Sequence, residues 1–314
     1  MPKISIIMRT KNNEDILSEA LSSLFQQTEQ DFELLIVDSG SVDKTLEIAR
    51  HYPHRLISIA PEDYFPGKVL NAAAEVAEGE FLVFQNSDVV LLHPEALSEL
   101  IAPLQRNDSV CGTFARQLPR PEAHLWVKAD YAKAFPAQPH APAWMTYSLP
   151  FAAMRKSTWM DFPFYTWAWG SEDTEWGLRQ RQRDARSIVY VPTAEVMHSH
   201  NYTLPQIYGR RYIEGEADAW MQRAQQGLFQ RSALKRWIHK GVRVLLQSTK
   251  DSAEAFTQGK YNEALHIFAR RLWWEWAHEK GFRQGLKRLK HHPDHLEQAH
   301  KGQQIVLQSH PSRQ

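Results

Sequence analysis

Short apolar runs alternate with amphipathic segments along the first third of the chain. Runs at residues 4–8, 32–37, 55–59 and 81–84 have the length of strands, and their largely unbroken apolar character is typical of strands buried on both faces of a sheet. Residues 16–25 place apolar side chains at helical spacing, and residues 44–50 and 68–78 also indicate helices. Strands that alternate with helices in this way form βαβ units, so the pattern predicts a doubly wound α/β fold with a parallel sheet.

The pattern changes twice further along the chain. Residues 110–115, 151–154 and 188–191 indicate further short strands, whereas residues 117–150 are rich in Pro, Ala and aromatic residues and are expected to form long surface loops. From about residue 205, segments 208–225 and 264–279 follow helical spacing without strand-like alternation. We therefore expect an α/β unit over residues 1–204 and a helical extension over residues 205–314.

The composition is that of an ordinary soluble protein. The 314 residues are 43% hydrophobic and 23% charged, with a net charge of +1, which is typical of a globular chain. The single cysteine, Cys111, excludes an intrachain disulfide and a thiolate metal site. The chain begins with a strand-like segment instead of a secretory signal, and no run reaches 18 apolar residues, so we expect a cytoplasmic protein.

The sequence lacks the Gly-rich loops by which many proteins bind nucleotides. It has no Gly-x-Gly-x-x-Gly and no Gly-Lys-[Ser/Thr] motif, so a dinucleotide-binding fold and a phosphate-cradling NTPase loop are poorly supported. A bound nucleotide would need another device, such as carboxylates at strand ends and a metal ion for its diphosphate.

Polar residues follow the apolar run 81–84 at the predicted end of its strand, namely Asn86, Ser87 and Asp88. In open α/β sheets the ligand lies beyond the carboxyl ends of the strands. A carboxylate and an amide at that edge suit a hard cation with oxygen ligands, which would in turn hold a diphosphate. The alternative is a polar turn that precedes the next helix.

A second candidate site lies between the strands at 151–154 and 188–191. Glu172, Asp173 and Glu175 crowd the predicted start of a helix, where the helix dipole favours negative charge. An acidic helix N-terminus alone does not explain the four tryptophans nearby, Trp159, Trp167, Trp169 and Trp176. Aromatic faces beside a carboxylate base are what a sugar site needs, because sugar C–H faces stack on rings while the base takes a hydroxyl proton.

Two histidines follow the last predicted strand, His198 and His200. We expect these two side chains to point to opposite faces of an extended segment, so that they do not readily bind one metal together. We expect His198 to reach a cation held by Asp88 and regard His200 as the less favoured ligand. The alternative is that both are structural.

The motifs together resemble a known family. The segments 4–12, 37–45, 81–88 and 169–173 and His198 occur in the order found in inverting glycosyltransferases of family 2, and the resemblance covers about residues 3–204. The likeness is strongest to bacterial rhamnosyltransferase-type members, which show a similar Gly-Lys-x-x-Asn helix start (Gly67 to Asn71), a similar Met154-Arg-Lys-Ser segment and a similar Val-x-His-Ser-His-Asn-Tyr.

The resemblance implies a GT-A fold, which is a Rossmann-like, mixed and mainly parallel sheet flanked by helices. It implies a nucleotide-sugar half at about residues 1–115 and an acceptor half at about 116–204. It assigns donor binding to Arg9, Thr10, Lys11, Asn12, Asp38, Lys68, Asn71, Asn86, Ser87 and Asp88. It also implies that Asp88 and His198 bind a divalent cation, Mn²⁺ or Mg²⁺, that Asp173 is the general base, and that Glu172, Trp169 and Gly170 contact the acceptor.

The sequence departs from the family at two positions. The Asp-x-Asp motif is here Asn86-Ser87-Asp88, so the first carboxylate is an amide that adds no charge. Leu70 stands where many members carry Arg, and Lys68 is expected to supply the missing positive charge to the diphosphate.

Three functions fit these residues. The first is transfer of a sugar from a nucleoside-diphosphate donor, dTDP-rhamnose or a UDP-sugar, to a glycan or lipid-linked hydroxyl with inversion. The second is a soluble glycosyltransferase that acts on a small acceptor such as glycerate. The third is a non-catalytic carbohydrate- or nucleotide-binding module that has lost metal binding through Asn86.

The helical extension is strongly basic. Residues 231–290 hold 14 Lys and Arg against 5 Asp and Glu, a net charge of +9, and also hold Trp237, Trp273, Trp274 and Trp276. Basic residues interleaved with Trp suit contact with an anionic membrane surface. The alternatives are that the tryptophans pack the helices against the α/β unit, or that the basic face binds nucleic acid, which we do not expect because no nucleic-acid motif accompanies it.

Overall fold

The computed structural model describes residues 2–166, 170–183, 187–224 and 233–291. Within these residues, eight strands form one mixed sheet in the order β3-β2-β1-β4-β7-β6-β8-β5. The strands are β1 (Ile4–Thr10), β2 (Phe32–Asp38), β3 (Arg55–Ser58), β4 (Phe81–Asn86), β5 (Val90–Leu91), β6 (Val110–Leu118), β7 (Phe151–Arg155) and β8 (Ser187–Met197).

The predicted βαβ series forms the parallel part of this sheet. Strand β1 pairs in parallel with both β2 and β4, and β2 pairs in parallel with β3. The connecting helices are α1 (Leu17–Phe25), α2 (Thr45–Ala49) and α3 (Pro66–Val76). Strand β7 is antiparallel to both β4 and β6, so the sheet is mixed and not wholly parallel.

The core lies on both faces of the sheet, as the unbroken apolar runs predict. One cluster packs α1 and α4 (Ala96–Arg106) on one face, and the other packs α3 and α7 (Glu172–Arg183) on the opposite face. Leu70, where many family members carry Arg, is 1% exposed in the second cluster. The residue therefore serves the core, and its position is unsuited to a charge.

The prediction of long surface loops over residues 117–150 is wrong in part. This stretch contains helix α5 (Leu125–Ala134), and α6 (Lys156–Asp161) follows β7. Leu125, Trp126 and Val127 of α5 are all buried, although three consecutive apolar residues do not give helical spacing. They are buried because α5 packs against helices from the distant C-terminal part of the chain.

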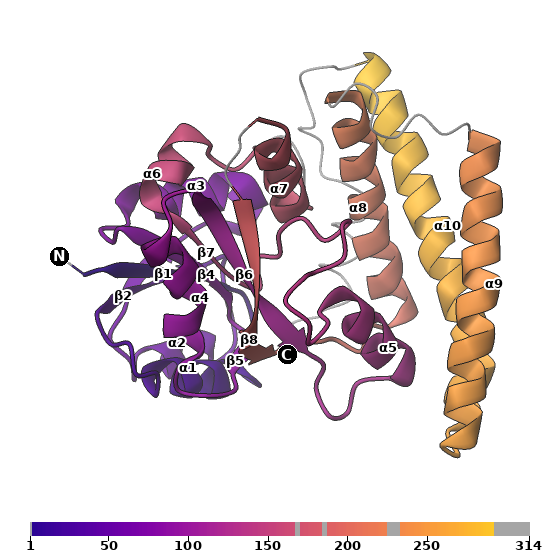
Figure 1. Ribbon diagram of the computed structural model, residues 1–314, viewed down its shortest axis with the longest axis horizontal. Helices are drawn as coiled ribbons and strands as arrows, with labels where there is room; N and C mark the ends of the chain where they lie inside the picture. The colour runs from indigo at the N-terminus through magenta and orange to yellow at the C-terminus, as the bar shows by residue number, and fades with distance from the viewer. Residues whose placement is uncertain (1, 167–169, 184–186, 225–232, 292–314) are drawn as a thin grey trace.

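The C-terminal extension is helical, as the spacing predicts. It contains α8 (Leu204–Ala224), α9 (Ala233–Thr257) and α10 (Tyr261–His291), which stand beside the sheet as a layer, with α9 farthest from it (Figure 1). No helix among the described residues is long and apolar enough to cross a membrane.

The tryptophans of α10 contact the rest of the protein. Trp274 packs edge-on against Trp126 of α5, with ring centroids 5.8 Å apart, and Trp273 Nε1 donates a hydrogen bond to the Leu204 carbonyl at 3.0 Å. The same surface of α10 carries the buried guanidinium of Arg271, which pairs with Asp130 of α5 and Asp251 of α9. These contacts favour the packing interpretation of Trp273 and Trp274, while the side chain of Trp237 lies outside the described residues.

Helices α8 and α10 approach so closely that their contact depends on glycine. A Cβ on Gly281 would lie 1.9 Å from the Tyr212 carbonyl oxygen. We predict that Gly281→Ala forces the two helices apart and destabilises the protein by about 1–3 kcal/mol. Gly241→Ala on α9 is the matched control, because a Cβ there meets nothing within 4 Å and the change should stabilise the helix by up to about 1 kcal/mol. Thermal denaturation measures both, and equal transition temperatures would contradict the close packing.

Candidate active site

A cleft of about 710 Å³ lies at the carboxyl ends of β1 and β4, between the start of α7 and the inner side of α8. Its walls come from three parts of the chain. The parallel sheet contributes Arg9 and Asp88, the first turn of α7 contributes Asp173, and the extension contributes Arg210 from α8 and His278 from α10. A concave site with several convergent polar groups is the usual location of a ligand.

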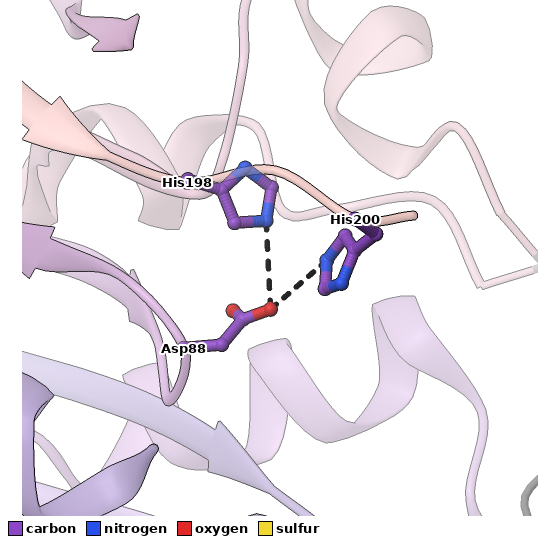
Figure 2. Close-up of side chains that lie close together, drawn as sticks. All are labelled: Asp88, His198 and His200. Carbon is purple, nitrogen blue, oxygen red and sulfur yellow. Dashed lines mark ion pairs between the residues drawn. The ribbon is translucent and has the colours of Figure 1, made fainter. Parts of the chain in front are cut away.

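A carboxylate and two imidazoles meet at one wall of this cleft (Figure 2). Asp88 Oδ2 lies 2.9 Å from His200 Nε2 and 3.7 Å from His198 Nε2. One ligand atom from each residue lies within 4.8 Å of the others, so the three could hold a metal ion together. The expectation that the two histidines point to opposite faces is wrong. Side chains two residues apart on an extended segment lie on the same side of the chain, and after β8 ends at Met197 both rings point toward Asp88.

The surroundings favour the protonation states of Asp88 and His198 that suit cation binding. Burial opposes the charge of Asp88, but His198 and His200 outweigh it and hold the pKa of this carboxyl well below its usual range. Burial lowers the pKa of His198 to about 4 against the attraction of Asp88, so this imidazole is neutral at pH 7. An ionised carboxylate and a neutral imidazole are the forms that bind metals.

Gln117 fixes the orientation of His198. His198 Nδ1 lies 2.9 Å from Gln117 Oε1, and Gln117 Nε2 donates a hydrogen bond to Ser148 Oγ at 2.8 Å. With Gln117 Oε1 as the acceptor, His198 donates from Nδ1, which leaves the lone pair of Nε2 available to a cation on the side of Asp88.

Asp173 lines the cleft and is held by backbone donors. Its Oδ2 accepts a hydrogen bond from Leu149 N at 3.2 Å, and its Oδ1 accepts one from Thr174 N at 2.7 Å. Burial and the neighbouring Glu172 carboxylate raise the pKa of Asp173 to about 6, against the effect of these two donors and of Arg9. A carboxylate of this kind is ionised at neutral pH yet basic enough to accept a proton.

Arg9 and Glu172 form an ion pair of 2.7 Å across the cleft floor. Both residues line the cleft. The Arg9 guanidinium is already paired with Glu172 in the first turn of α7. Thr10, Lys11, Asn86, Ser87 and Gly170 also line the cleft, whereas Trp169 lies outside the described residues.

Asn12 and Asp38 shape the edge of the cleft without lining it. Asp38 Oδ2 accepts hydrogen bonds from Gly40 N and Ser41 N at 3.0 Å. Asn12 has a left-handed backbone with φ of 50° and accepts a hydrogen bond from Val42 N at 2.9 Å. These contacts tie the loops after β1 and β2 together, so both side chains are engaged by the protein.

The Gly-Lys-x-x-Asn motif packs α3 against a distant segment. Asn71 Nδ2 donates to the Phe164 carbonyl at 2.8 Å, and its Oδ1 accepts from Trp159 Nε1 and Phe164 N. A Cβ on Gly67 would lie 2.0 Å from the Tyr165 carbonyl oxygen. Lys68 is exposed, with Nζ above the Phe65 ring, so the structure brings neither Lys68 nor Asn71 to the cleft.

No local pattern indicated the residues that α8 and α10 bring to the cleft. Arg210 lies beside the Asp88 cluster, with its guanidinium 4.8 Å from the Tyr202 ring centroid. No ion pair joins Arg210 to any residue that the structure describes, whereas its neighbour Arg211 pairs with Glu214. Gln117 was likewise missed, because its role depends on a contact across 81 residues of sequence.

The chain is similar to known proteins in both sequence and structure. The family model described as Glycosyl transferase family 2 matches residues 5–157. The O-antigen chain rhamnosyltransferase WbaN of Salmonella anatum is 31% identical over 71% of this chain and 75% of that protein. This chain belongs to glycosyl transferase family 2. It is therefore a glycosyltransferase, and the resemblance noted in its motifs is confirmed.

Solved structures show the same fold. The mannosyltransferase PcManGT from Pyrobaculum calidifontis, in complex with GDP-Man and Mn²⁺, matches with a TM-score of 0.57 and 15% identity over 94% of this chain and 88% of that chain. Glucosyl-3-phosphoglycerate synthase from Mycobacterium tuberculosis, in complex with UDP, matches with a TM-score of 0.54 and 19% identity over 71% of this chain and 79% of that chain. These matches confirm the GT-A type of fold for this glycosyltransferase.

The hydrogen bond between Gln117 and His198 gives a prediction about the Asp88 cluster. Gln117→Leu removes the acceptor for the His198 Nδ1 proton, so we expect Mn²⁺ affinity to fall about 10–100-fold. Calorimetric titration with Mn²⁺ measures the loss, and Gln105→Leu on the exposed side of α4 is the control. Unchanged affinity in Gln117→Leu would show that His198 needs no such orientation or is not a ligand.

Proposed function

We propose that this enzyme transfers a sugar from a nucleoside-diphosphate donor to an acceptor hydroxyl by a single in-line displacement with inversion. The observation that carries the proposal is the meeting of two groups in one cleft: the Asp88 cluster, suited to a cation, and Asp173, suited to act as a base. Family membership supports sugar transfer as the reaction and disfavours a non-catalytic binding module.

The donor side fits a divalent cation. Asp88, His198 and His200 would hold the ion, with one carboxylate oxygen and two imidazole nitrogens as the available protein ligands. This mixed set is softer than the all-oxygen set that Mg²⁺ prefers, so we propose Mn²⁺ as the better ion of the two. When bound, the ion would neutralise charge on the diphosphate leaving group. Asn86 lines the same wall and adds a polar group without adding charge.

Arg210 supports the same leaving group. Its guanidinium lies in the cleft without an ion-pair partner among the described residues, and its field lowers the pKa of His198. The cation site has only one carboxylate. A guanidinium beside it would attract the phosphate oxygens directly and so add to the binding of the diphosphate. We therefore assign the diphosphate to Arg210 and not to Lys68.

The acceptor side supplies the base. Asp173 would take the proton of the acceptor hydroxyl as that oxygen attacks the anomeric carbon, and the bond from this carbon to the diphosphate breaks at the same time. No covalent sugar–enzyme intermediate is needed. Burial and the Glu172 carboxylate, which pairs with Arg9, raise the pKa of Asp173 and so its affinity for the proton.

We propose a glycan or a lipid-linked glycan as the acceptor. Rhamnose is the first transferred sugar to test. The support is the sequence similarity to a protein named as an O-antigen chain rhamnosyltransferase, which extends over 71% of this chain. Transfer to a lipid-linked acceptor would bring the enzyme to an anionic membrane surface. A small acceptor such as glycerate is the alternative, and the likeness to glucosyl-3-phosphoglycerate synthase supports it only at the level of the fold.

Replacement of the base tests the proposal. Asp173→Asn keeps the shape of the site but cannot accept a proton, so we expect kcat to fall roughly 10²–10⁴-fold while nucleoside-diphosphate binding is retained. The measurement is sugar transfer from radiolabelled donors, with the anomeric configuration of the product determined by NMR. Asp161→Asn, at the exposed end of α6, is the control. Near wild-type turnover in Asp173→Asn, or retention of configuration, would contradict the proposed mechanism.

The pH dependence of the rate follows from the raised pKa of Asp173. The ionised form is the active base, so kcat should fall about tenfold per pH unit below the pKa of about 6 and level off above it. Initial rates at saturating donor, with the folded state checked at each pH, measure this profile. A rate that stays constant through pH 6, or that falls as pH rises, would mean that another group limits the reaction.

A further inference from the structure

The α9–α10 hairpin presents an exposed apolar face. The members of this face are 44–77% exposed and comprise Ile238, Val242, Leu245, Leu246 and Phe256 of α9 and Tyr261, Leu265, Phe268, Leu272 and Trp276 of α10. At 3.6 residues per turn, these positions place each set on one side of its helix. Exposed apolar surface of this extent marks an interaction site more often than an ordinary protein surface.

Packing within the protein accounts for only part of this face, at Trp276, whose ring contacts those of Tyr208 and Trp273. The buried residues of α9, such as Val244, Asp251 and Ala255, lie on the other side of the helix. The Phe256 and Tyr261 rings lie 4.9 Å apart across the turn between the helices, so the two stripes meet there. We name the ten residues the hairpin face.

The segment that carries the hairpin face is basic. Residues 231–290 carry a net charge of +9. At the turn, beside Tyr261, a pocket of about 590 Å³ is lined by the basic side chains of His124, Lys260, His266 and Arg270, and Glu263 is the one acidic residue among its described lining residues. Arg270 Nη1 is buried without a hydrogen-bond partner in the part of the chain that the structure describes.

We propose that the hairpin face docks onto an anionic membrane, with its apolar side chains among the acyl chains and the basic pocket against lipid phosphates. Apolar residues bordered by Lys and Arg are the features by which a helix lies in the interface of a bilayer that contains anionic lipids. A second copy of this chain is the less suitable partner, because a symmetric contact would bring two segments of charge +9 together.

The location of the face suits the proposed reaction. The inner side of α10 contributes His278 to the cleft, while its outer side carries Leu272 and Trp276. A membrane at the hairpin face would therefore lie one helix away from the cleft. The link to a lipid-linked acceptor rests on the proposed function, whereas membrane binding itself requires neither donor nor acceptor.

Vesicle binding by the full chain tests the proposal. Sedimentation with vesicles of phosphatidylcholine alone, and with vesicles in which about one third of the lipid is phosphatidylglycerol, should show binding to the anionic vesicles only, weakened by salt. Leu246→Glu and Leu265→Glu replace side chains that are 66% and 77% exposed, so they should fold normally and bind roughly tenfold more weakly. Met160→Glu, at a residue 67% exposed on α6, is the matched control and should bind as the wild type does.

The basic pocket has its own test. Lys260→Gln combined with Arg270→Gln should reduce the preference for phosphatidylglycerol vesicles while thermal denaturation stays unchanged. Absence of wild-type binding to anionic vesicles, or equal binding by Leu246→Glu and Leu265→Glu, would overturn the proposal. Light scattering that shows a dimer disrupted by these two changes, without vesicle binding, would assign the face to a second copy instead. Asp173→Asn should bind vesicles as the wild type does while sugar transfer is lost. That result would support membrane docking independently of the proposed transfer reaction.

Discussion

The ion pair between Arg9 and Glu172 joins strand β1 to helix α7 at the cleft of this glycosyltransferase. Arg9 is the penultimate residue of a central strand, and Glu172 opens α7 more than 160 residues later, so the pair fixes where the first turn of α7 meets the sheet. Neither partner is easily lost, because removal of one would leave the other charge largely buried and uncompensated. The same pair holds a negative charge next to Asp173. Together with burial and the backbone donors, this contact therefore sets the position of Asp173, the proposed base, and its affinity for a proton.

The helical extension packs against α5 and also contributes residues to the cleft. Arg271 joins α10 to Asp251 of α9 and Asp130 of α5 through a buried ionic cluster. The glycine contacts between α8 and α10 bring these helices close enough for Arg210 and His278 to reach the same cleft. The cleft thus takes the Asp88 cluster from strand ends and Arg210 from a helix far along the chain.

The sequence predicted what depends on local pattern. The apolar runs at 4–8, 32–37 and 81–84 gave the parallel strands, and the polar residues that follow them gave Asp88 at the correct edge of the sheet. The acidic start of α7 likewise predicted where Asp173 lies. The errors concern features that depend on tertiary contact. The His200 error is instead one of local geometry, because side chains two residues apart on an extended segment lie on the same side of the chain. Asn71 is engaged by Phe164 and Trp159, which no local spacing reveals. Helix α5 was missed because distant helices bury its apolar residues.

The central claim is that one cleft binds a nucleoside diphosphate through a cation at the Asp88 cluster. The most direct test is a thermal-shift panel of thymidine, uridine, guanosine and cytidine diphosphates, each with Mn²⁺, Mg²⁺ or a chelator. A ligand at about 100 times its Kd stabilises the folded state by roughly 2.7 kcal/mol, which raises the transition of a chain of this size by several degrees. We predict that one diphosphate raises it only with metal, more with Mn²⁺ than with Mg²⁺, and that Asp88→Ala abolishes the shift. A shift that is equally large with the chelator, or no shift with any diphosphate, would contradict the account.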